Sequence, residues 1–470
     1  MIALTLGEVA GIVGGRLVGA DPATPVIGSV EFDSRQITPG GLFLALPGEH
    51  VDGHDFVDAV AAAGAAASLV TRPVDGPVIE VADGFAALAA LAAAVVRRLP
   101  DALVIGVTGS SGKTSTKDVL AQLLARLGPT VAPPGSFNNE LGHPYTVLRA
   151  DPSTRFLVLE TSARGIGHIR YLAEIAPPRI GVVLNVGSAH LGEFGSRQAI
   201  AQAKGELVEA LPPGGLAVLN ADDPLVLAMR TRTQARVLTV GRSEQADLRA
   251  ENVELDALGR ASFDLVSGAD RRRVALRLVG EHHVGNVLAA AAVALECGMA
   301  FAELVAELGE VTPASRWRME VTERRDDVLV INDAYNANPE SVRAALQTLA
   351  AVGSHRAGRT FAVLGEMAEL GDDGPAQHQA VGRLAARLHV AHVIAVGEVA
   401  RPIQQGAALE SSAPDESRWV PDVDAAIALL RSELRAADVV LVKASRAARL
   451  ERVAEAITDG AATDDGGEAG

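Results

Sequence analysis

The segment VIGVTGSSGKTSTKD, residues 104–118, has the residue types of a phosphate-binding loop. In such a loop, backbone amides at the start of a helix donate to phosphate oxygens, a lysine adds positive charge, and a hydroxyl binds Mg²⁺. Lys113 and Thr114 supply the last two groups here. The usual spacing would place the first glycine at Val107, so this loop is a variant of the pattern. A glycine-rich turn with a solvated lysine is the alternative that involves no ligand.

Three further residues could act beside a phosphate loop, and each has a structural alternative. Glu160 ends the apolar run FLVLE, where a carboxylate could bind Mg²⁺ or face solvent. His190 follows NVGSA and could bind a metal or serve only as a hydrogen-bonded structural residue. Lys204 lies in the middle of a predicted helix, where spacing alone indicates a solvated surface lysine.

A second group of polar residues occurs in NDAYNANPES, after an apolar strand and before a predicted helix. Asp333 ends the strand, and Asn336 and Asn338 follow it. Helix capping explains Asn338 but not so many polar groups together. Arg316 and Arg318 precede this segment, and either could be a surface charge or a phosphate clamp.

The elements around these residues alternate between short apolar strands and helices. DALVIGVTG, RFLVLETS, RIGVVLNVGSAH and GGLAVLNADDP are predicted strands that each end in polar residues, with helices between them. This order is typical of a parallel sheet covered by helices, in which ligands bind beyond the carboxyl ends of the strands. Residues 235–280 alternate apolar and polar positions and predict antiparallel strands.

We expect three α/β domains and a short tail. Pro100 follows a predicted helix, and a second break at Thr312 and Pro313 precedes a renewed alternation of strands and helices. The acidic, glycine-rich C-terminus predicts disorder. The expected divisions are residues 1–99, 100–312, 313–456 and a disordered tail at 457–470.

Composition narrows the classes of function. The 470 residues carry a formal charge of −16, which argues against a nucleic-acid-binding protein because such proteins need a basic face. A single cysteine, Cys297, allows no internal disulfide or cysteine-based metal site. The longest apolar run, residues 84–96, is too short to span a bilayer and predicts a buried helix. We therefore expect a cytoplasmic globular protein.

Several motifs together resemble the Mur ligases, ATP-dependent enzymes that build the peptide of bacterial peptidoglycan. The variant phosphate loop matches that family, and the match continues through FNNELGHP, VLETSARGIGHI, NVGSAHLGEFGS, AKGELVEAL, GEHHVGNVLAAAAVA, NDAYNANPESVRAAL, VLGEMAELG and VKASRAARLE. It covers nearly the whole chain in the family's order. DAYNANPES and LGEMAELG are most similar to the member that joins D-alanyl-D-alanine to UDP-N-acetylmuramoyl-tripeptide.

The resemblance implies a fold, a reaction and a set of ligands. It implies a mixed α/β UDP-sugar-binding domain, a central P-loop-like ATPase domain with a mostly parallel sheet, and a C-terminal Rossmann-like domain. It implies ATP and Mg²⁺ as cofactors, an acyl phosphate on the tripeptide, and a monomeric enzyme. The third residue of the tripeptide is left open.

The resemblance also implies roles for individual residues. It places the ATP phosphates, adenine and ribose at Gly109, Ser110, Ser111, Gly112, Lys113, Thr114, Ser115, His282, Asn286, Arg318 and Asp333. It places one Mg²⁺ at Thr114 and Glu160 and a second at His190, beside Lys204 carbamylated to an anion, and makes Lys113, Glu160, His190 and Lys204 the catalytic set. It places the substrates at Ser34, Arg35, Asn138, Asn139, Thr161, Ser162, Asn336 and Asn338.

Three positions depart from the family's pattern. His283 stands where asparagine is common, Ala444 replaces a glycine, and Trp317 precedes Arg318 where many members have glycine. The alternatives are another amide ligase of the superfamily, such as a sister Mur ligase or folylpolyglutamate synthase, and a nucleotide-gated binding module without ligase activity.

Overall fold

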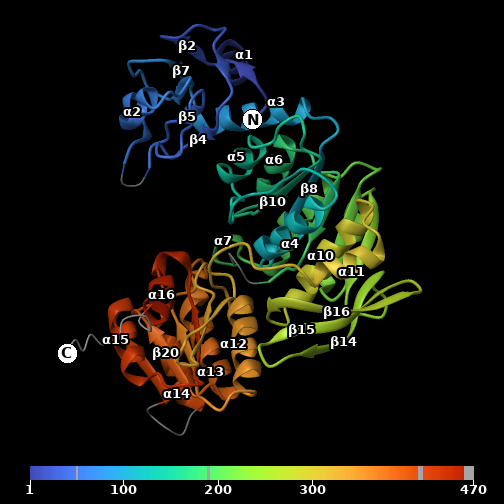
Figure 1. The fold of residues 1–470 in the computed structure, drawn as a ribbon, viewed down its shortest axis with the longest axis vertical. Coiled ribbons are helices and arrows are strands. Elements are labelled where there is room, and N and C mark those ends of the chain that lie inside the picture. The colour runs from blue at the N-terminus through green and yellow to red at the C-terminus, as the bar shows by residue number, and fades with distance from the viewer. Residues whose placement is uncertain (49–50, 188–190, 411–415, 460–470) are drawn as a thin grey trace, which may run out of the picture.

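The computed structural model describes residues 1–48, 51–187, 191–410 and 416–459. Within these ranges the chain forms three regions that follow one another along the long axis of the molecule (Figure 1). Each region is built around its own mostly parallel sheet with helices packed beside it. The predicted α/β class with three successive regions is confirmed.

The N-terminal region contains a five-stranded sheet in the order β2-β7-β6-β5-β4, in which only β2 runs antiparallel to its neighbour. Its strands are β2 (Arg16–Val18), β4 (Val30–Glu31), β5 (Leu42–Leu44), β6 (Ala67–Val70) and β7 (Val78–Glu80), with a separate pair, β1 (Leu4–Thr5) and β3 (Pro25–Val26). Its helices are α1 (Leu6–Val13), α2 (Val57–Ala62) and α3 (Gly84–Arg97).

The central region contains a nine-stranded sheet in the order β16-β15-β14-β13-β12-β11-β8-β10-β9. Its strands are β8 (Leu103–Thr108), β9 (Thr130–Val131), β10 (Phe156–Glu160), β11 (Ile180–Val183), β12 (Leu216–Asn220), β13 (Arg236–Gly241), β14 (Leu248–Leu255), β15 (Arg260–Ser267) and β16 (Asp270–Val279). Its helices are α4 (Lys113–Ala125), α5 (Gly142–Val147), α6 (His168–Ile175), α7 (Leu191–Phe194), α8 (Arg197–Glu209), α9 (Pro224–Leu227), α10 (His283–Glu296) and α11 (Phe301–Leu308).

The prediction of antiparallel strands over residues 235–280 is wrong at its start. β13 runs parallel to both β12 and β14, and the antiparallel pairs are β14–β15 and β15–β16. The chain crosses over through α9 before β13, so this strand still extends the parallel sheet.

The C-terminal region contains a six-stranded sheet in the order β17-β18-β22-β19-β20-β21, parallel except at β17. Its strands are β17 (Glu320–Glu323), β18 (Leu329–Asn332), β19 (Thr360–Leu364), β20 (His392–Val396), β21 (Ser417–Val420) and β22 (Val439–Lys443). Its helices are α12 (Pro339–Gly353), α13 (Gly374–Arg387), α14 (Arg401–Glu410), α15 (Val423–Glu433) and α16 (Glu451–Asp459).

The exact domain divisions stay a prediction, and the expectation that residues 457–459 belong to a disordered tail is wrong. The N-terminal core is continuous with central residues, because Leu91 on α3 belongs to the same buried cluster as Leu159 on β10. Residues 457–459 belong to α16, and Ile457 is fully buried, so they are ordered by packing. Residues 460–470 lie outside the described chain. No helix of the described residues is long and apolar enough to cross a membrane.

Candidate active site

A cavity of about 480 Å³ lies between the central and C-terminal regions. Its walls come from the phosphate loop, from the ends of central strands and from the start of the C-terminal region. The predicted site residues that line it are Ser110, Ser111, Gly112, Lys113, Thr114, Ser115, Asn138, Asn139, Glu160, Ser162, His282, Asn286, Arg318, Asp333, Asn336 and Asn338. The fold thus brings together residues separated by more than two hundred positions.

The phosphate loop connects β8 to α4 and has a conformation that depends on glycine. Gly112 has φ +81°, and a Cβ there would lie 2.3 Å from Oδ1 of Asn286 on α10. Lys113 folds back, and its Nζ donates to the carbonyl oxygen of Gly109 at 2.8 Å. Burial lowers the pKa of Lys113, and the nearby Glu160 carboxylate opposes that shift. The start of α4 therefore presents a cation and free helix amides to the cavity.

Asn185, which the sequence reasoning missed, holds the phosphate loop in place. Its Oδ1 accepts from the Ser111 backbone N–H at 2.9 Å, and its Nδ2 donates to the Ser111 carbonyl oxygen at 3.1 Å. Its own carbonyl oxygen accepts from the Ser110 N–H at 3.1 Å. Asn185 follows β11, which lies beside β8 in the sheet. Its position directly after a predicted strand is the sequence feature that could have indicated a role at the site.

Glu160 is the centre of a cluster of oxygen and amide groups. This carboxylate is 1% exposed and accepts from Thr114 Oγ1 at 3.1 Å, Ser136 Oγ at 3.0 Å and Asn138 Nδ2 at 2.8 Å. Ser162 in turn donates to Asn138 Oδ1 at 3.0 Å. Ser136 was also missed by the sequence reasoning. In the described part of the chain, no three His, Cys, Asp or Glu side chains are grouped so that they could hold a metal.

Arg318 reaches the phosphate loop from the C-terminal region, whereas Arg316 lies on the surface. Nη2 of Arg318 donates to Thr114 Oγ1 at 3.3 Å, and its guanidinium lies 4.2 Å from the ring centroid of Tyr335. The side chain of Arg316 is 69% exposed. Of the two arginines left open by the sequence, only Arg318 is placed to contact a phosphate in this cavity.

The segment after β18 adds a buried ion pair and a helix start. Nζ of Lys443 donates to Asp333 Oδ2 at 2.5 Å and to the Asn336 carbonyl oxygen at 2.9 Å. Asn338 caps α12 by accepting from the Ser341 N–H at 2.9 Å, as its position predicted. Its Nδ2 also donates to the Ser110 carbonyl oxygen at 3.4 Å. The capping residue therefore links the two regions as well.

Lys204 is buried, contrary to the surface position that its helical spacing indicated. It is 4% exposed on α8, and its amine has no hydrogen bond or ion pair within the described part of the chain. Burial lowers its pKa well below the usual value, and the charge of Lys113 lowers it further. Burial therefore favours the neutral, nucleophilic form of this amine.

Some predicted site residues lie elsewhere. His190 falls outside the described residues. Ser34 and Arg35 belong to the N-terminal region, where Arg35 pairs with Asp33 at 2.8 Å. Thr161 is buried away from the cavity, because its hydroxyl donates to the carbonyl oxygen of Val107 at 3.2 Å. Asn139 does line the cavity, but its Oδ1 accepts from the N–H of Gly142, the first residue of α5, at 2.9 Å.

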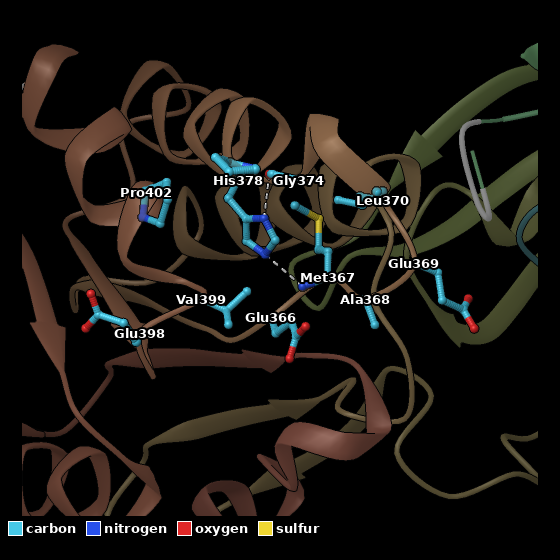
Figure 2. Close-up of a pocket in the computed structure, with 12 residues that line it drawn as sticks. Glu366, Met367, Ala368, Glu369, Leu370, Gly374, His378, Glu398, Val399 and Pro402 are labelled. Atoms are coloured by element: carbon cyan, nitrogen blue, oxygen red, sulfur yellow. Dashed lines mark hydrogen bonds between the residues drawn. The ribbon is translucent and has the colours of Figure 1, made fainter. Parts of the chain in front are cut away.

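A second cavity of about 330 Å³ lies on the C-terminal region around residues 366–371 (Figure 2). His378 fixes this segment, because its Nε2 accepts from the Met367 N–H at 2.8 Å and its Nδ1 bonds the Gly374 carbonyl oxygen at 2.7 Å. These two bonds define the neutral tautomer, and burial lowers the pKa of His378. Ala368 and Glu369 line both cavities, so His378 supports one wall of the main site.

Comparisons with known proteins point to one family over nearly the whole chain. Three family models match in order: the catalytic domain of the Mur ligase family over residues 26–103, the Mur ligase middle domain over 107–294, and the glutamate ligase domain of Mur ligases over 317–446. The chain is 52% identical to the UDP-N-acetylmuramoyl-tripeptide–D-alanyl-D-alanine ligase of Mycobacterium tuberculosis, over 97% of this chain and 98% of the relative.

Two solved structures share the fold. One is the UDP-N-acetylmuramoylalanyl-D-glutamyl-2,6-diaminopimelate–D-alanyl-D-alanyl ligase of Acinetobacter baumannii, with a TM-score of 0.81, 31% identity, and 96% and 97% of the two chains covered. The other is the MurF ligase of Thermotoga maritima in complex with ADP, with a TM-score of 0.79, 30% identity, and 92% and 98% covered.

Proposed function

The chain belongs to the Mur ligase family, and from that premise we propose that it joins D-alanyl-D-alanine to UDP-N-acetylmuramoyl-tripeptide at the expense of ATP. The observation that carries this proposal is the convergence of the phosphate loop, Glu160 and Arg318 on one cavity, in a chain similar to such ligases over nearly its full length. The products are the UDP-linked pentapeptide, ADP and phosphate, so the enzyme belongs to peptidoglycan precursor synthesis.

The reaction needs an activated carboxyl group, because a carboxylate is a poor acylating agent. The terminal carboxylate of the tripeptide attacks the γ-phosphorus of ATP, ADP leaves, and an acyl phosphate forms. The amine of D-alanyl-D-alanine then attacks the acyl carbon, loses a proton, and phosphate leaves. Lys113 and Arg318 stabilise the charge that spreads over the transferred phosphoryl oxygens.

The residues around Glu160 fit a magnesium ion. The hydroxyl of Thr114 and the carboxylate of Glu160 lie 3.1 Å apart, and oxygen ligands are those that Mg²⁺ prefers. When bound, Mg²⁺ neutralises phosphate charge and orients the phosphate oxygens. We propose that Thr114 and Glu160 would hold this ion and that His190 would hold a second one.

Lys204 fits the proposed carbamate. A neutral buried amine can react with CO₂, forming a C–N bond and losing one proton. The resulting anion would lie near Lys113 and offer oxygens to the metal site. The orphaned amine of Lys204 is the feature of this chain that favours the modification.

The remaining assignments follow the walls of the cavity. We propose that His282 and Asn286 contact adenine, that Asp333 contacts ribose, and that Asn138 and Ser162 contact the tripeptide. Ser34 and Arg35 are proposed for the uridine end. Because one chain supplies all of these walls, we propose a monomer, acting in the cytoplasm where ATP and UDP-linked precursors are available.

A phosphate-release assay tests the function directly. With ATP and Mg²⁺ present, the purified protein should release phosphate continuously only when UDP-N-acetylmuramoyl-tripeptide and D-alanyl-D-alanine are both added. Mass spectrometry should detect the UDP-linked pentapeptide. Equal turnover with UDP-linked dipeptide, or with free D-alanine or glutamate in place of D-alanyl-D-alanine, would reject this substrate assignment in favour of another amide ligase.

A further inference from the structure

Arg164 lines the main cavity on the side of the proposed tripeptide contacts. It follows Ser162 in the segment between β10 and α6, and its side chain is exposed. Within the described part of the chain, its guanidinium makes no hydrogen bond or ion pair with protein. A free guanidinium facing a binding cavity is suited to a carboxylate or a phosphate.

The other arginines and lysines of the cavity, counted over the described residues, already have protein partners. They are Lys113 on the carbonyl oxygen of Gly109, Arg318 on Thr114, Lys443 on Asp333, and Arg446 on Glu451. Lys113 and Arg318 also lie at the phosphate loop, where ATP requires them. Arg164 is therefore the cation that is available to a different anionic group.

The segment that carries Arg164 is fixed by hydrogen bonds, chiefly to a buried carboxylate. Glu206 on α8 is 1% exposed, and its carboxylate accepts from the backbone N–H groups of Gly167 at 2.6 Å and Arg170 at 3.0 Å. The Arg164 N–H donates to Nδ1 of His168 at 3.4 Å, which closes the turn. The buried carboxylate thus fixes the start of α6, so the arginine extends from an ordered support.

The proposed substrate has carboxylates that the reaction does not consume. In the peptide alanyl-D-glutamyl-2,6-diaminopimelate, which names the substrate of the A. baumannii relative, glutamate keeps one free carboxylate and diaminopimelate keeps one besides the reacting group. We propose that Arg164 binds one of these unreacted carboxylates and so selects the tripeptide. This inference rests on the proposed function and adds a specificity residue to it.

Steady-state kinetics of Arg164→Ala and Arg164→Lys test the proposal. Arg164→Ala should raise the KM for UDP-linked tripeptide about 10- to 100-fold, the scale of one hydrogen bond to a charged group. The kcat and the KM values for ATP and D-alanyl-D-alanine should stay within about twofold, because binding outside the reacting centre is lost equally from ground and transition states. The tripeptide KM of Arg164→Lys should lie between those of the wild type and Arg164→Ala, since an ammonium keeps the charge but lacks the planar fork of the guanidinium.

Two substrates identify which carboxylate is bound. If Arg164 contacts the side chain of the third residue, Arg164→Ala should raise the KM for the tripeptide that contains diaminopimelate and leave the KM for the tripeptide that contains lysine unchanged. If it contacts the glutamate carboxylate, both substrates should be affected equally. Arg170→Ala is the matched control, because Arg170 lies on α6 outside the cavity, 3.8 Å from Glu209.

An unchanged KM for both tripeptides in a folded Arg164→Ala enzyme would overturn the proposal, as would an effect confined to ATP. Thermal unfolding of the variant should match the wild type, which separates binding from folding. The wild type in the same assay separates this inference from the proposed function. If the wild type shows no tripeptide-dependent turnover, the function is wrong, whereas normal wild-type turnover with an unaffected variant rejects only the role of Arg164.

Discussion

Lys204 and Glu206 lie two residues apart on α8, are both buried, and have opposite surroundings. Glu206 accepts from two backbone N–H groups, whereas Lys204 has no partner in the described chain. Side chains two residues apart on a helix point in different directions, so one supports α6 and the other lies near Lys113. A buried ionisable group without a partner is costly unless it is neutral or modified.

Lys204→Ala should lower kcat by about two to three orders of magnitude, on the scale of a lost electrostatic stabiliser. Acetate should restore part of the activity, because its carboxylate can occupy the vacated volume and replace the anion of the carbamate. Turnover over a range of acetate concentrations, together with intact mass of the wild type at high bicarbonate, measures both effects.

Lys113→Ala is the control for that rescue. This variant loses a cation beside the phosphates, so acetate should not restore it. Normal turnover of Lys204→Ala, or equal acetate rescue of both variants, would contradict the carbamate.

His143 makes folding stability depend on pH. It is 1% exposed on α5, and burial lowers its pKa to about 4. An unfolded histidine binds a proton near pH 6.5, so stability from neutral His143 is complete above that pH and is lost as the pH falls toward 4. Between pH 8 and pH 5 this residue should remove about 2 kcal/mol from the free energy of unfolding.

Urea unfolding of the wild type and of His143→Asn at both pH values measures this contribution. The buried His283 and His378 also have lowered pKa values, but both residues remain in both proteins. The change in unfolding free energy between the two pH values therefore differs between the proteins only by the contribution of His143. Identical pH dependence in the two proteins would contradict the assignment.

At the scale of elements, neighbouring segments set the shape of the phosphate loop and of the Arg318 turn. Asn286 on α10 closes the space beside Gly112, and Asn185 after β11 holds the loop backbone. Trp317 and Met319, on either side of Arg318, have φ values of +58° and +51°, an uncommon conformation for residues other than glycine. The unusual backbone beside Arg318 coincides with the residue that approaches Thr114.

Gly112→Ala should weaken ATP binding at least about tenfold, because the new Cβ would collide with Asn286 and the φ of +81° disfavours a side chain. Calorimetric titration of ATP measures the change. Gly285→Ala is the matched control. Gly285 lies on the neighbouring helix α10, and a Cβ there would meet nothing within 4 Å. Its ATP affinity should equal that of the wild type, and equal affinities for both variants would show that the loop tolerates a side chain.

At the scale of the whole molecule, the C-terminal region is held against the central region by backbone contacts around the site. The Ser315 backbone N–H donates to Asp118 Oδ2 on α4 at 3.1 Å. A Cβ on Gly371 would lie 2.9 Å from Cα of Gly192 on α7. Both glycines are exposed, so the contact lies at the solvent-facing edge of the interface, where separation of the two regions would admit water to an acyl phosphate.

Gly371→Ala should reduce kcat about tenfold while changing the KM for ATP less, because it separates the two regions without touching the phosphate loop. The side chain would also be strained at φ +60°. Gly374→Ala is the control, since its nearest neighbour is 4.0 Å away. The ratio of amide product to ATP consumed should fall in Gly371→Ala if water reaches the acyl phosphate, and an unchanged ratio and rate would contradict a role in closure.

Sequence alone determined the features that depend on neighbouring residues. The strand–loop–helix order around Lys113 and the cap at Asn338 rest on bonds between positions a few residues apart, so local pattern predicts them. The alternating α/β class follows from periodicity, for the same reason. The family's motifs added the candidate site residues, of which most line one cavity.

Tertiary structure decided what depends on distant parts of the chain. Asn185 bonds a loop 74 positions away, and Arg318 bonds a hydroxyl 204 positions away, so no local pattern assigns either contact. Helical spacing placed Lys204 in solvent, but the packing of α8 against the sheet buries it. Periodicity defines which residues share a face, whereas burial and hydrogen bonding depend on which surface covers that face, and only the folded chain determines that.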